Sequence, residues 1–325
     1  MPSPSFSKPP WLAAAPALFL LLWSAGFPVA KICLQYVEPL TFLALRYALV
    51  LVILLPLVVA LRPPWPKTLL EWLHLAVVGF LIQVVYFGLC YLAFAMGEKA
   101  GTVALIVSLQ PILVALFAPA ITGEQVGLQR WVGLVFGLAG AGIVILVRSA
   151  TEVASPLGIV LICGALLGIT AGALYEKRYG IHQHPVTANA VQYAVGFAGT
   201  LPFAAALETH AIQWSGGFVG SLAYLVIANS IISMTLLFAM IRYGEVARVS
   251  ALFFLVPPVT AVLSWLMLSE LIPLLAWPGI LLAAIGVALA SWPSQKGPRR
   301  EAIRSGATSP PGRLSQNPSG PHDAP

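Results

Sequence analysis

Charged residues are scarce in this chain. They make up 9% of its 325 residues, whereas hydrophobic residues make up 59%. A soluble globular domain carries about 25% charged residues, and no soluble fold of this length has an interior large enough for so much apolar surface. The composition therefore excludes a soluble protein and predicts an all-α polytopic membrane protein.

Cysteine is also scarce, and its three copies, Cys33, Cys90 and Cys163, lie far apart. An odd number of widely spaced cysteines indicates neither a disulfide framework nor a metal site. The sequence has no GxxxxGK[ST] phosphate loop, no HExxH and no GxSxG. ATP-driven transport by this chain, zinc proteolysis and serine hydrolysis therefore have no motif here. We expect no cofactor and no metal.

Long apolar runs are abundant. A bilayer span needs about 20 apolar residues, and a carboxylate is costly at the bilayer centre. One glutamate falls in each of the nine connections between ten apolar runs, which supports this count. The first run has no clear small-x-small cleavage site and more apolar runs follow it, so we interpret it as a retained span. The ten predicted spans are 11–30, 39–61, 70–95, 99–120, 128–147, 156–175, 187–207, 217–241, 247–268 and 272–292.

The distribution of Lys and Arg predicts the orientation, because these residues favour the cytoplasmic side of a membrane. With a cytoplasmic N-terminus, most of the 17 Lys and Arg residues fall on that side, so we expect both termini there. Residues 1–10 would form a short cytoplasmic tail. Residues 293–325, rich in Pro, Gly, Ser and Arg, would form a disordered basic tail. This tail is either a solvated topogenic segment or a contact for anionic lipid.

The sequence repeats itself at an offset of 146 residues. Identities at proline and charged positions are hard to produce by apolar bias, so we predict an internal duplication with five spans in each of residues 11–150 and 151–292. Because five is odd, the second repeat enters the membrane in the opposite sense. Inverted repeats around a central cavity are the architecture of many secondary transporters. Aligned pairs include Lys31 and Lys177, Tyr47 and Tyr193, Pro111 and Pro257, Glu124 and Glu270, and Gly140 and Gly286.

Several stretches resemble the EamA-type transporters of the drug/metabolite transporter superfamily. They are "LLWSAGFPVAK", "LALRYALVL", "AGTVALIVSLQPILVALFA" followed by "GE", "YEKRYG", and "GEVARVSALFFLVPPVTAVLSWLMLSE". The resemblance covers about residues 11–292. It implies a ten-helix basket in a bacterial inner membrane, with a cavity lined by the first, third, fourth, sixth, eighth and ninth spans. No motif assigns the chain to a subfamily of known substrate.

Polar and kinking residues inside spans are the candidate cavity residues, because such groups are expensive in lipid and usually face protein or water. Gln110 and Pro111 interrupt the fourth span, and Pro257 and Pro258, with Thr260, hold the equivalent place in the ninth. Proline frees a backbone carbonyl, and glutamine adds two donors and an acceptor. The alternative is a packing kink in which Gln110 bonds to a neighbouring helix.

The third and eighth spans each carry a polar patch. Gln83, Tyr86 and Tyr91 lie in the third span, where Gln83 and Tyr86 share a helix face. Asn229 and Ser233 share a face in the eighth span. Each patch lines a cavity or makes plain contacts between helices.

Arg46 is the only basic residue well within a predicted span, and its equivalent in the second repeat is Gln192. An arginine can hold a substrate carboxylate with two parallel N–H bonds. Because Arg46 is only about two turns from the helix end, the alternative is that it snorkels or pairs with a loop carboxylate. Trp23 and Tyr175 complete the candidate cavity residues.

The leading hypothesis is a secondary transporter, not an enzyme, that moves small metabolites by alternating access. By family analogy we expect efflux of amino acids or related metabolites. The alternatives are a non-transporting receptor or scaffold, an uptake permease and a channel, with an intramembrane enzyme disfavoured because no acid pair lies within the spans. The expected partners are a small-molecule substrate and the lipid bilayer. We expect no nucleic acid and leave a homodimer open.

Overall fold

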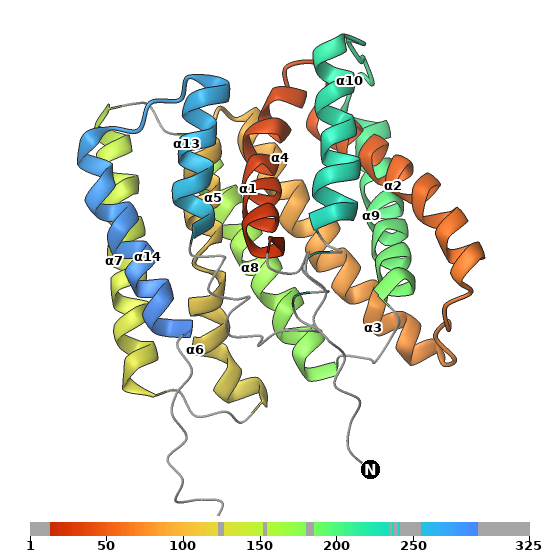
Figure 1. Ribbon diagram of the computed structural model, residues 1–325, viewed down its shortest axis with the longest axis horizontal. Helices are drawn as coiled ribbons and strands as arrows, with labels where there is room; N and C mark the ends of the chain where they lie inside the picture. The colour runs from red at the N-terminus through yellow and green to blue at the C-terminus, as the bar shows by residue number, and fades with distance from the viewer. Residues whose placement is uncertain are drawn as a thin grey trace, which may run out of the picture. The chain divides into compact units, whose positions relative to one another are not determined.

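The computed structural model describes residues 14–122, 127–151, 155–179, 185–233 and 255–291, together with Leu236 and Met240. The regular structure of these residues is helical throughout, without a strand. A described helix or helical run overlaps every one of the ten predicted spans (Figure 1). Six of these runs are long and apolar enough to cross a membrane, and the others are shorter apolar helices. The protein is an all-α polytopic membrane protein.

The first half of the chain contains five spans, of which the third includes a π-helical segment and the fourth is broken into two helices. Its elements are α1 (Ala15–Cys33), α2 (Pro39–Leu61), α3 (Leu69–Gly79), the π-helical η2 (Phe80–Tyr86), α4 (Phe87–Ala95), α5 (Ala100–Val107), α6 (Gln110–Thr122) and α7 (Leu128–Thr151).

The second half follows the same order and has a π-helical segment at the equivalent place in its third span. Segments of this kind are rare and occur frequently at functional sites. The described elements are α8 (Pro156–Tyr179), α9 (Pro185–Leu207), α10 (Gly216–Ala223), the π-helical η3 (Tyr224–Ser233), α13 (Val256–Leu268), the short 3₁₀ turn η5 (Leu274–Ala276) and α14 (Trp277–Ser291).

The break in the fourth span falls where the sequence places a proline. Helix α5 ends at Val107 and α6 begins at Gln110, immediately before Pro111. A proline has no N–H to donate and crowds the preceding turn, so the helix is interrupted here. In the ninth span, residues 247–254 lie outside the described part of the chain, and α13 begins at Val256 with Pro257 in its first turn.

Helices α7 and α14, the fifth spans of the two halves, touch through their backbones. An ideal Cβ on Gly140 would stand 2.5 Å from the Gly279 carbonyl oxygen, and one on Gly286 would stand 2.6 Å from the Gly133 carbonyl oxygen. Each contact is the image of the other at an offset of 146 residues, as in a two-fold interface. The early residues of α7 meet the late residues of α14, so the helices run antiparallel (Figure 1).

Helices α2 and α9, the second spans of the two halves, also pack antiparallel. Just after α9, the Glu208 carboxylate accepts hydrogen bonds from the backbone N–H groups of Leu40, at 2.8 Å, and Thr41, at 2.6 Å. It thereby caps the positive N-terminal end of α2. At the opposite end, the Thr187 hydroxyl near the start of α9 donates to the Pro64 carbonyl beyond α2 at 3.1 Å.

The equivalent tyrosines of these two helices meet between them. The rings of Tyr47 and Tyr193 lie 5.7 Å apart, and both side chains are buried. The pseudo-two-fold relation between the halves therefore runs through this pair and through the glycine contact of α7 and α14. Antiparallel pairing of equivalent helices is the geometry of an inverted repeat.

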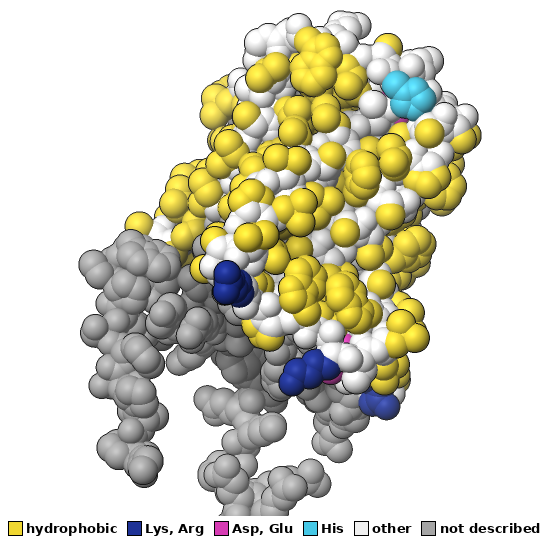
Figure 2. All heavy atoms as spheres, turned by 90° about the vertical axis from the view of Figure 1, so that its right-hand side faces the viewer, with side chains coloured by type: hydrophobic (Ala, Val, Ile, Leu, Met, Phe, Trp, Pro, Cys, Tyr) yellow, Lys and Arg dark blue, Asp and Glu magenta, His cyan; other side chains and the backbone are white. Residues whose placement is uncertain are grey.

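The outer surface is apolar, as a bilayer requires. Figure 2 shows one face over which hydrophobic side chains are spread from end to end, while the Lys and Arg side chains in view lie toward its lower end. Leu61, Val59 and Leu73 are examples of large hydrophobic side chains that are more than half exposed. Such a surface is stable against lipid, not water.

Candidate functional site

Arg46 is the centre of the site because it is a charged side chain that is only 2% exposed. Its Nη1 donates to the Tyr91 hydroxyl at 2.8 Å, and its Nη2 donates to Asn229 Oδ1 at 3.0 Å and to Ser230 Oγ at 2.9 Å. Its Nε also donates to Ser230 Oγ, at 3.2 Å. The guanidinium lies over the Phe87 ring, 5.2 Å from the ring centre. Helix α2 thus presents its cation to the third span of its own half and to η3 of the other half.

All of these partners are neutral. No carboxylate among the described residues bonds to Arg46, and the ion pair between Lys31 and Glu270 does not involve it. A guanidinium has five N–H groups and the four bonds of Arg46 leave one Nη1 N–H without an acceptor in this set. A buried charge without a counterion costs several kcal/mol. Ionisable groups are kept at such places chiefly for function.

A cavity of about 30 Å³ lies against the guanidinium, between the two halves. Its wall is mostly aromatic, and nearly all of it comes from α1, α2 and the third span of the first half. The second half contributes Asn229 from η3. The lining residues are Trp23, Gly26, Phe27, Ala30, Arg46, Tyr86, Phe87, Cys90, Tyr91, Phe94 and Asn229.

The amide of Asn229 is held in one orientation. Its Nδ2 donates to the Leu22 carbonyl at 3.3 Å, which turns Oδ1 toward Arg46. Gly26 makes this approach of α1 and η3 sterically possible, because a Cβ at Gly26 would overlap the Asn229 amide.

The π-helical segment η3 orients the Ser230 hydroxyl so that its oxygen accepts hydrogen bonds from Arg46. The Ser230 hydroxyl donates to the Leu225 carbonyl, five residues earlier, at 2.9 Å. The Ser233 hydroxyl donates to the Ala228 carbonyl with the same spacing and at the same distance. Because its proton is used in this bond, Ser230 Oγ can only accept from Arg46. Segment η3 therefore supplies oxygen acceptors without supplying a negative charge.

The Tyr91 hydroxyl accepts from Arg46 and keeps its own proton to donate. Its ring is stacked on the buried Phe42 ring, with centres 5.5 Å apart and planes 16° apart. This packing fixes the hydroxyl beside the guanidinium, so two donors face the same small cavity.

The structure brings five of the sequence-predicted cavity residues into this one cavity: Trp23, Arg46, Tyr86, Tyr91 and Asn229.

The other predicted residues do not line this cavity. Pro257 lines a second cavity, and Gln110 and Pro111 begin α6. Gln83 has a buried side-chain oxygen without a partner among the described residues, while its backbone carbonyl accepts from Tyr47 at 2.7 Å.

The remaining candidates make contacts between or within helices. Thr260 donates to the Ser24 carbonyl at 3.2 Å and so joins α13 to α1. Ser233 bonds within η3, and Pro258 lies beside Pro257 in the first turn of α13. The hydroxyl of Tyr175 in α8 is 2.8 Å from Nδ1 of His74 in α3.

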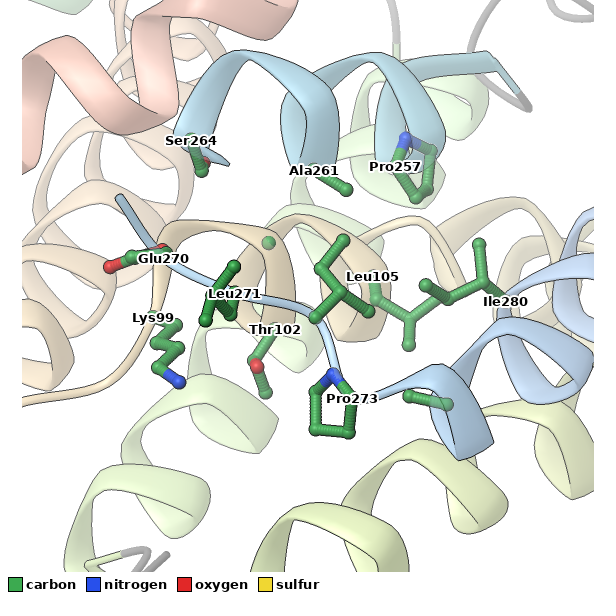
Figure 3. Close-up of a pocket in the computed structure, with 13 residues that line it drawn as sticks. Lys99, Thr102, Leu105, Pro257, Ala261, Ser264, Glu270, Leu271, Pro273 and Ile280 are labelled. Atoms are coloured by element: carbon green, nitrogen blue, oxygen red, sulfur yellow. The ribbon is translucent and has the colours of Figure 1, made fainter. Parts of the chain in front are cut away.

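The second cavity, of about 40 Å³, lies between α5, α13 and the segment that leads into α14 (Figure 3). Its wall is mainly apolar, with Thr102, Ser264 and Lys99 as polar exceptions and Glu270 at one end. The Glu270 carboxylate already accepts from Lys31 Nζ, at 2.7 Å, and from the backbone N–H of Ala100, at 3.1 Å. With this carboxylate paired, the Arg46 cavity is the better candidate site.

Lys31 and Glu270 tie three segments together at one end of the molecule. Lys31 in the last turn of α1 also donates to the Glu98 carbonyl, at 2.7 Å, in the turn before α5. The end of α1, the α4–α5 turn and the end of α13 are thus joined by one ion pair and two backbone bonds.

Several lining residues were not predicted from the sequence, although a signal for them exists. On α1, the unpredicted Gly26, Phe27 and Ala30 follow the predicted Trp23 by three, four and seven residues, which is one face of a helix. Because every face of a membrane helix is apolar, this spacing does not stand out from the rest of the span.

Comparison with known proteins agrees with this architecture. A model of the EamA-like transporter family matches residues 11–146 and matches again at residues 156–292. The chain belongs to the EamA-like transporter family. It is therefore a multi-pass membrane transporter, and both of its halves carry the family's unit.

Two individual proteins are similar to this EamA-like chain. The uncharacterized transporter YvbV of Bacillus subtilis (strain 168) is 26% identical over 286 residues, which cover 86% of this chain and 91% of that protein. A solved crystal structure, titled only as that of a protein, has a TM-score of 0.61 and 18% identity. The match covers 87% of this chain and 97% of that chain and shows a shared fold.

Proposed function

We propose that this EamA-like protein is a secondary transporter that moves small metabolites by alternating access, with efflux of amino acids or related metabolites as the leading case. In this proposal the chain lies in a bacterial inner membrane with both termini in the cytoplasm. The observation that carries the proposal is the Arg46 cavity, which has a buried unbalanced cation at the junction of two antiparallel halves.

The size of the cavity supports a moving site. At about 30 Å³ it has room for about two water molecules. A metabolite would enter only when α1 and η3 separate, and these elements belong to different halves. Relative motion of two inverted repeats around a fixed site is the usual basis of alternating access.

The Lys31–Glu270 pair supports closure at one end. It joins the ends of α1 and α13 beside the α4–α5 turn and is only partly exposed. Lys177 in the second repeat is equivalent to Lys31, and Glu124 in the first repeat is equivalent to Glu270. Glu124 lies outside the described residues, so we propose a closing role only for the Lys31–Glu270 pair, which would open when the protein changes conformation.

The test is untargeted metabolite profiling of medium and cell interior. Cells would express the wild type, Arg46→Gln, the matched surface variant Arg178→Gln, or an empty vector. We expect one class of compounds to shift across the membrane with wild type and Arg178→Gln, and not with Arg46→Gln or vector.

Two other results would separate the parts of this proposal. If Arg46→Gln and wild type shift the same compounds equally, the protein is a transporter but the Arg46 cavity is not its substrate site. If no compound shifts, and purified protein in liposomes moves no candidate solute, the chain acts as a receptor or scaffold instead.

A further inference from the structure

We infer that the Arg46 cavity selects an organic carboxylate that has an apolar body and no ammonium group beside the carboxylate. This inference rests on the proposed transport function and narrows its substrate class: within amino acids and related metabolites, it favours the related carboxylates without an amine over the amino acids themselves. It follows from three properties of the cavity: an unbalanced cation, free donors beside it, and no acidic side chain in its wall.

The uncompensated charge of the Arg46 guanidinium favours an anionic ligand. Arg46 is bonded to a tyrosine hydroxyl, an amide oxygen and a serine hydroxyl, and none of these balances its charge. A small anion entering the cavity would supply the missing charge. Charge-assisted bonds between a guanidinium and a carboxylate are among the strongest hydrogen bonds in proteins.

The free donors fit a carboxylate. One Nη1 N–H of Arg46 has no acceptor among the described residues, and the Tyr91 hydroxyl, 2.8 Å from Nη1, keeps its proton. The two donors are neighbours, so one carboxylate group can accept from both. Neither of these donors is used by Asn229 or Ser230, so their bonds to Arg46 do not compete with the carboxylate.

An ammonium group would find no such partner. No Asp or Glu lies among the described residues that line the cavity. The oxygen of Asn229 is taken by Arg46, and the Leu22 carbonyl already accepts from Asn229, at 3.3 Å, and from the Tyr224 hydroxyl, at 2.9 Å. A second positive charge beside Arg46 would also be repelled. Zwitterionic amino acids should therefore bind more weakly than the same skeleton without the amine.

The rest of the wall fits an apolar body. Beyond the polar corner, the cavity is bounded by rings and small apolar groups, such as Trp23, Phe27, Phe94 and Ala30. Aromatic rings offer large apolar area and favourable ring–ring contacts. An aryl-substituted short-chain carboxylate satisfies both ends of the site.

Three compounds on one skeleton test the inference: 3-phenylpropionate, L-phenylalanine and 3-phenylpropan-1-ol. Binding would be measured by equilibrium dialysis on the full chain purified in detergent. We expect 3-phenylpropionate to bind at least about 10-fold more tightly than the other two, since each of these leaves a buried polar group without a partner. Arg46→Gln should weaken the binding of 3-phenylpropionate by about 30-fold, and Tyr91→Phe should weaken it by about 5-fold. Arg178→Gln, on an exposed side chain, should bind as wild type does.

Tyr91→Phe keeps the inference testable if Arg46→Gln does not fold, because it leaves the charge and the ring in place. Tighter binding of L-phenylalanine, or wild-type affinity in both Arg46→Gln and Tyr91→Phe, would overturn the substrate class. Flux of the same compounds into proteoliposomes tests the transport function separately from the substrate class. If 3-phenylpropionate binds but does not cross the membrane, the transport function is rejected and the carboxylate site is retained. Arg46-dependent flux of a solute that lacks a carboxylate would keep transport and reject the class.

Discussion

The two halves of the molecule make symmetric packing contacts with each other, but they carry different residues at the cavity. Gly140 and Gly286 make the same contact in opposite directions, and Tyr47 meets its own equivalent, Tyr193. At the site, by contrast, Arg46 corresponds to Gln192. The symmetric contacts hold two similar units in opposite senses, which alternating access requires. The asymmetric residues place one cation, and not two, at the proposed site.

The largest effect on stability is expected at the glycine contact between α7 and α14, where the two halves match most closely. Gly140→Ala or Gly286→Ala should each lower the free energy of unfolding in detergent by about 3 kcal/mol, because the new methyl group meets backbone that cannot turn aside. The two losses should be equal, since the two contacts are equivalent. Gly142→Ala on the same helix is the matched control, because a Cβ there has nothing within 4 Å. A loss for Gly142→Ala as large as for Gly140→Ala would reject the close contact.

The next effect concerns the position where the halves differ most. Arg46→Gln makes the first half like the second and should lower the transport rate at limiting substrate by about 30-fold, or about 2 kcal/mol. Gln192→Ala should change this rate by less than about 3-fold, because Gln192 does not line the cavity. Initial rates in proteoliposomes would measure both. Equal losses at the two positions would mean that the site is symmetric after all.

A smaller effect separates the amides of the two π-helical segments. Asn229 has partners on both sides of its amide, whereas the buried side-chain oxygen of its equivalent, Gln83, has none among the described residues. Asn229→Leu should cost about 1–2 kcal/mol in unfolding free energy, because it leaves an N–H of Arg46 unpaired. Gln83→Leu should cost less than about 0.5 kcal/mol, since it removes an unsatisfied oxygen. The reverse order would contradict the assignment of Asn229 to the site.

The smallest effect is a pH dependence at the α2–α9 junction, outside the spans. Glu38 accepts from both the hydroxyl and the backbone N–H of Thr209, which lowers the pKa of its carboxyl below 4.5. Since the pKa is lower in the folded state, the stabilisation is present above pH 4.5 and is lost as the pH falls through the folded value. Thr209→Val should therefore lower the melting temperature slightly at pH 6, and the difference from wild type should disappear in more acidic buffer. A difference that is constant with pH would contradict this contact.

The scaffold was predictable from the sequence because membrane spans and the repeat leave strong signals. Apolar runs separated by glutamates gave the ten spans, and Pro111 marked the break in the fourth span. Arg46 was identifiable because a charge inside a span is rare.

Two features of the site were not predictable. The direction in which Arg46 points depends on the packing of α2 against η3, since snorkelling and substrate binding begin from the same sequence position. The aromatic wall on α1 has the helical spacing of a cavity face, but lipid-facing positions are equally apolar. Gln110 was chosen for its polarity, and neither the Arg46 cavity nor the second cavity includes it. Its role stays a prediction.

The most direct test of the account is the accessibility of Cys90, which lines the cavity and is buried. A chain with Cys33→Ala and Cys163→Ala retains this one thiol. A membrane-impermeant maleimide would be applied to sealed vesicles of each orientation. We expect Cys90 to react from both sides. We also expect Glu270→Gln to speed labelling from the side of the Lys31–Glu270 pair and to slow it from the other side. Faster labelling from both sides, or no labelling from either, would contradict a site that opens to one side at a time.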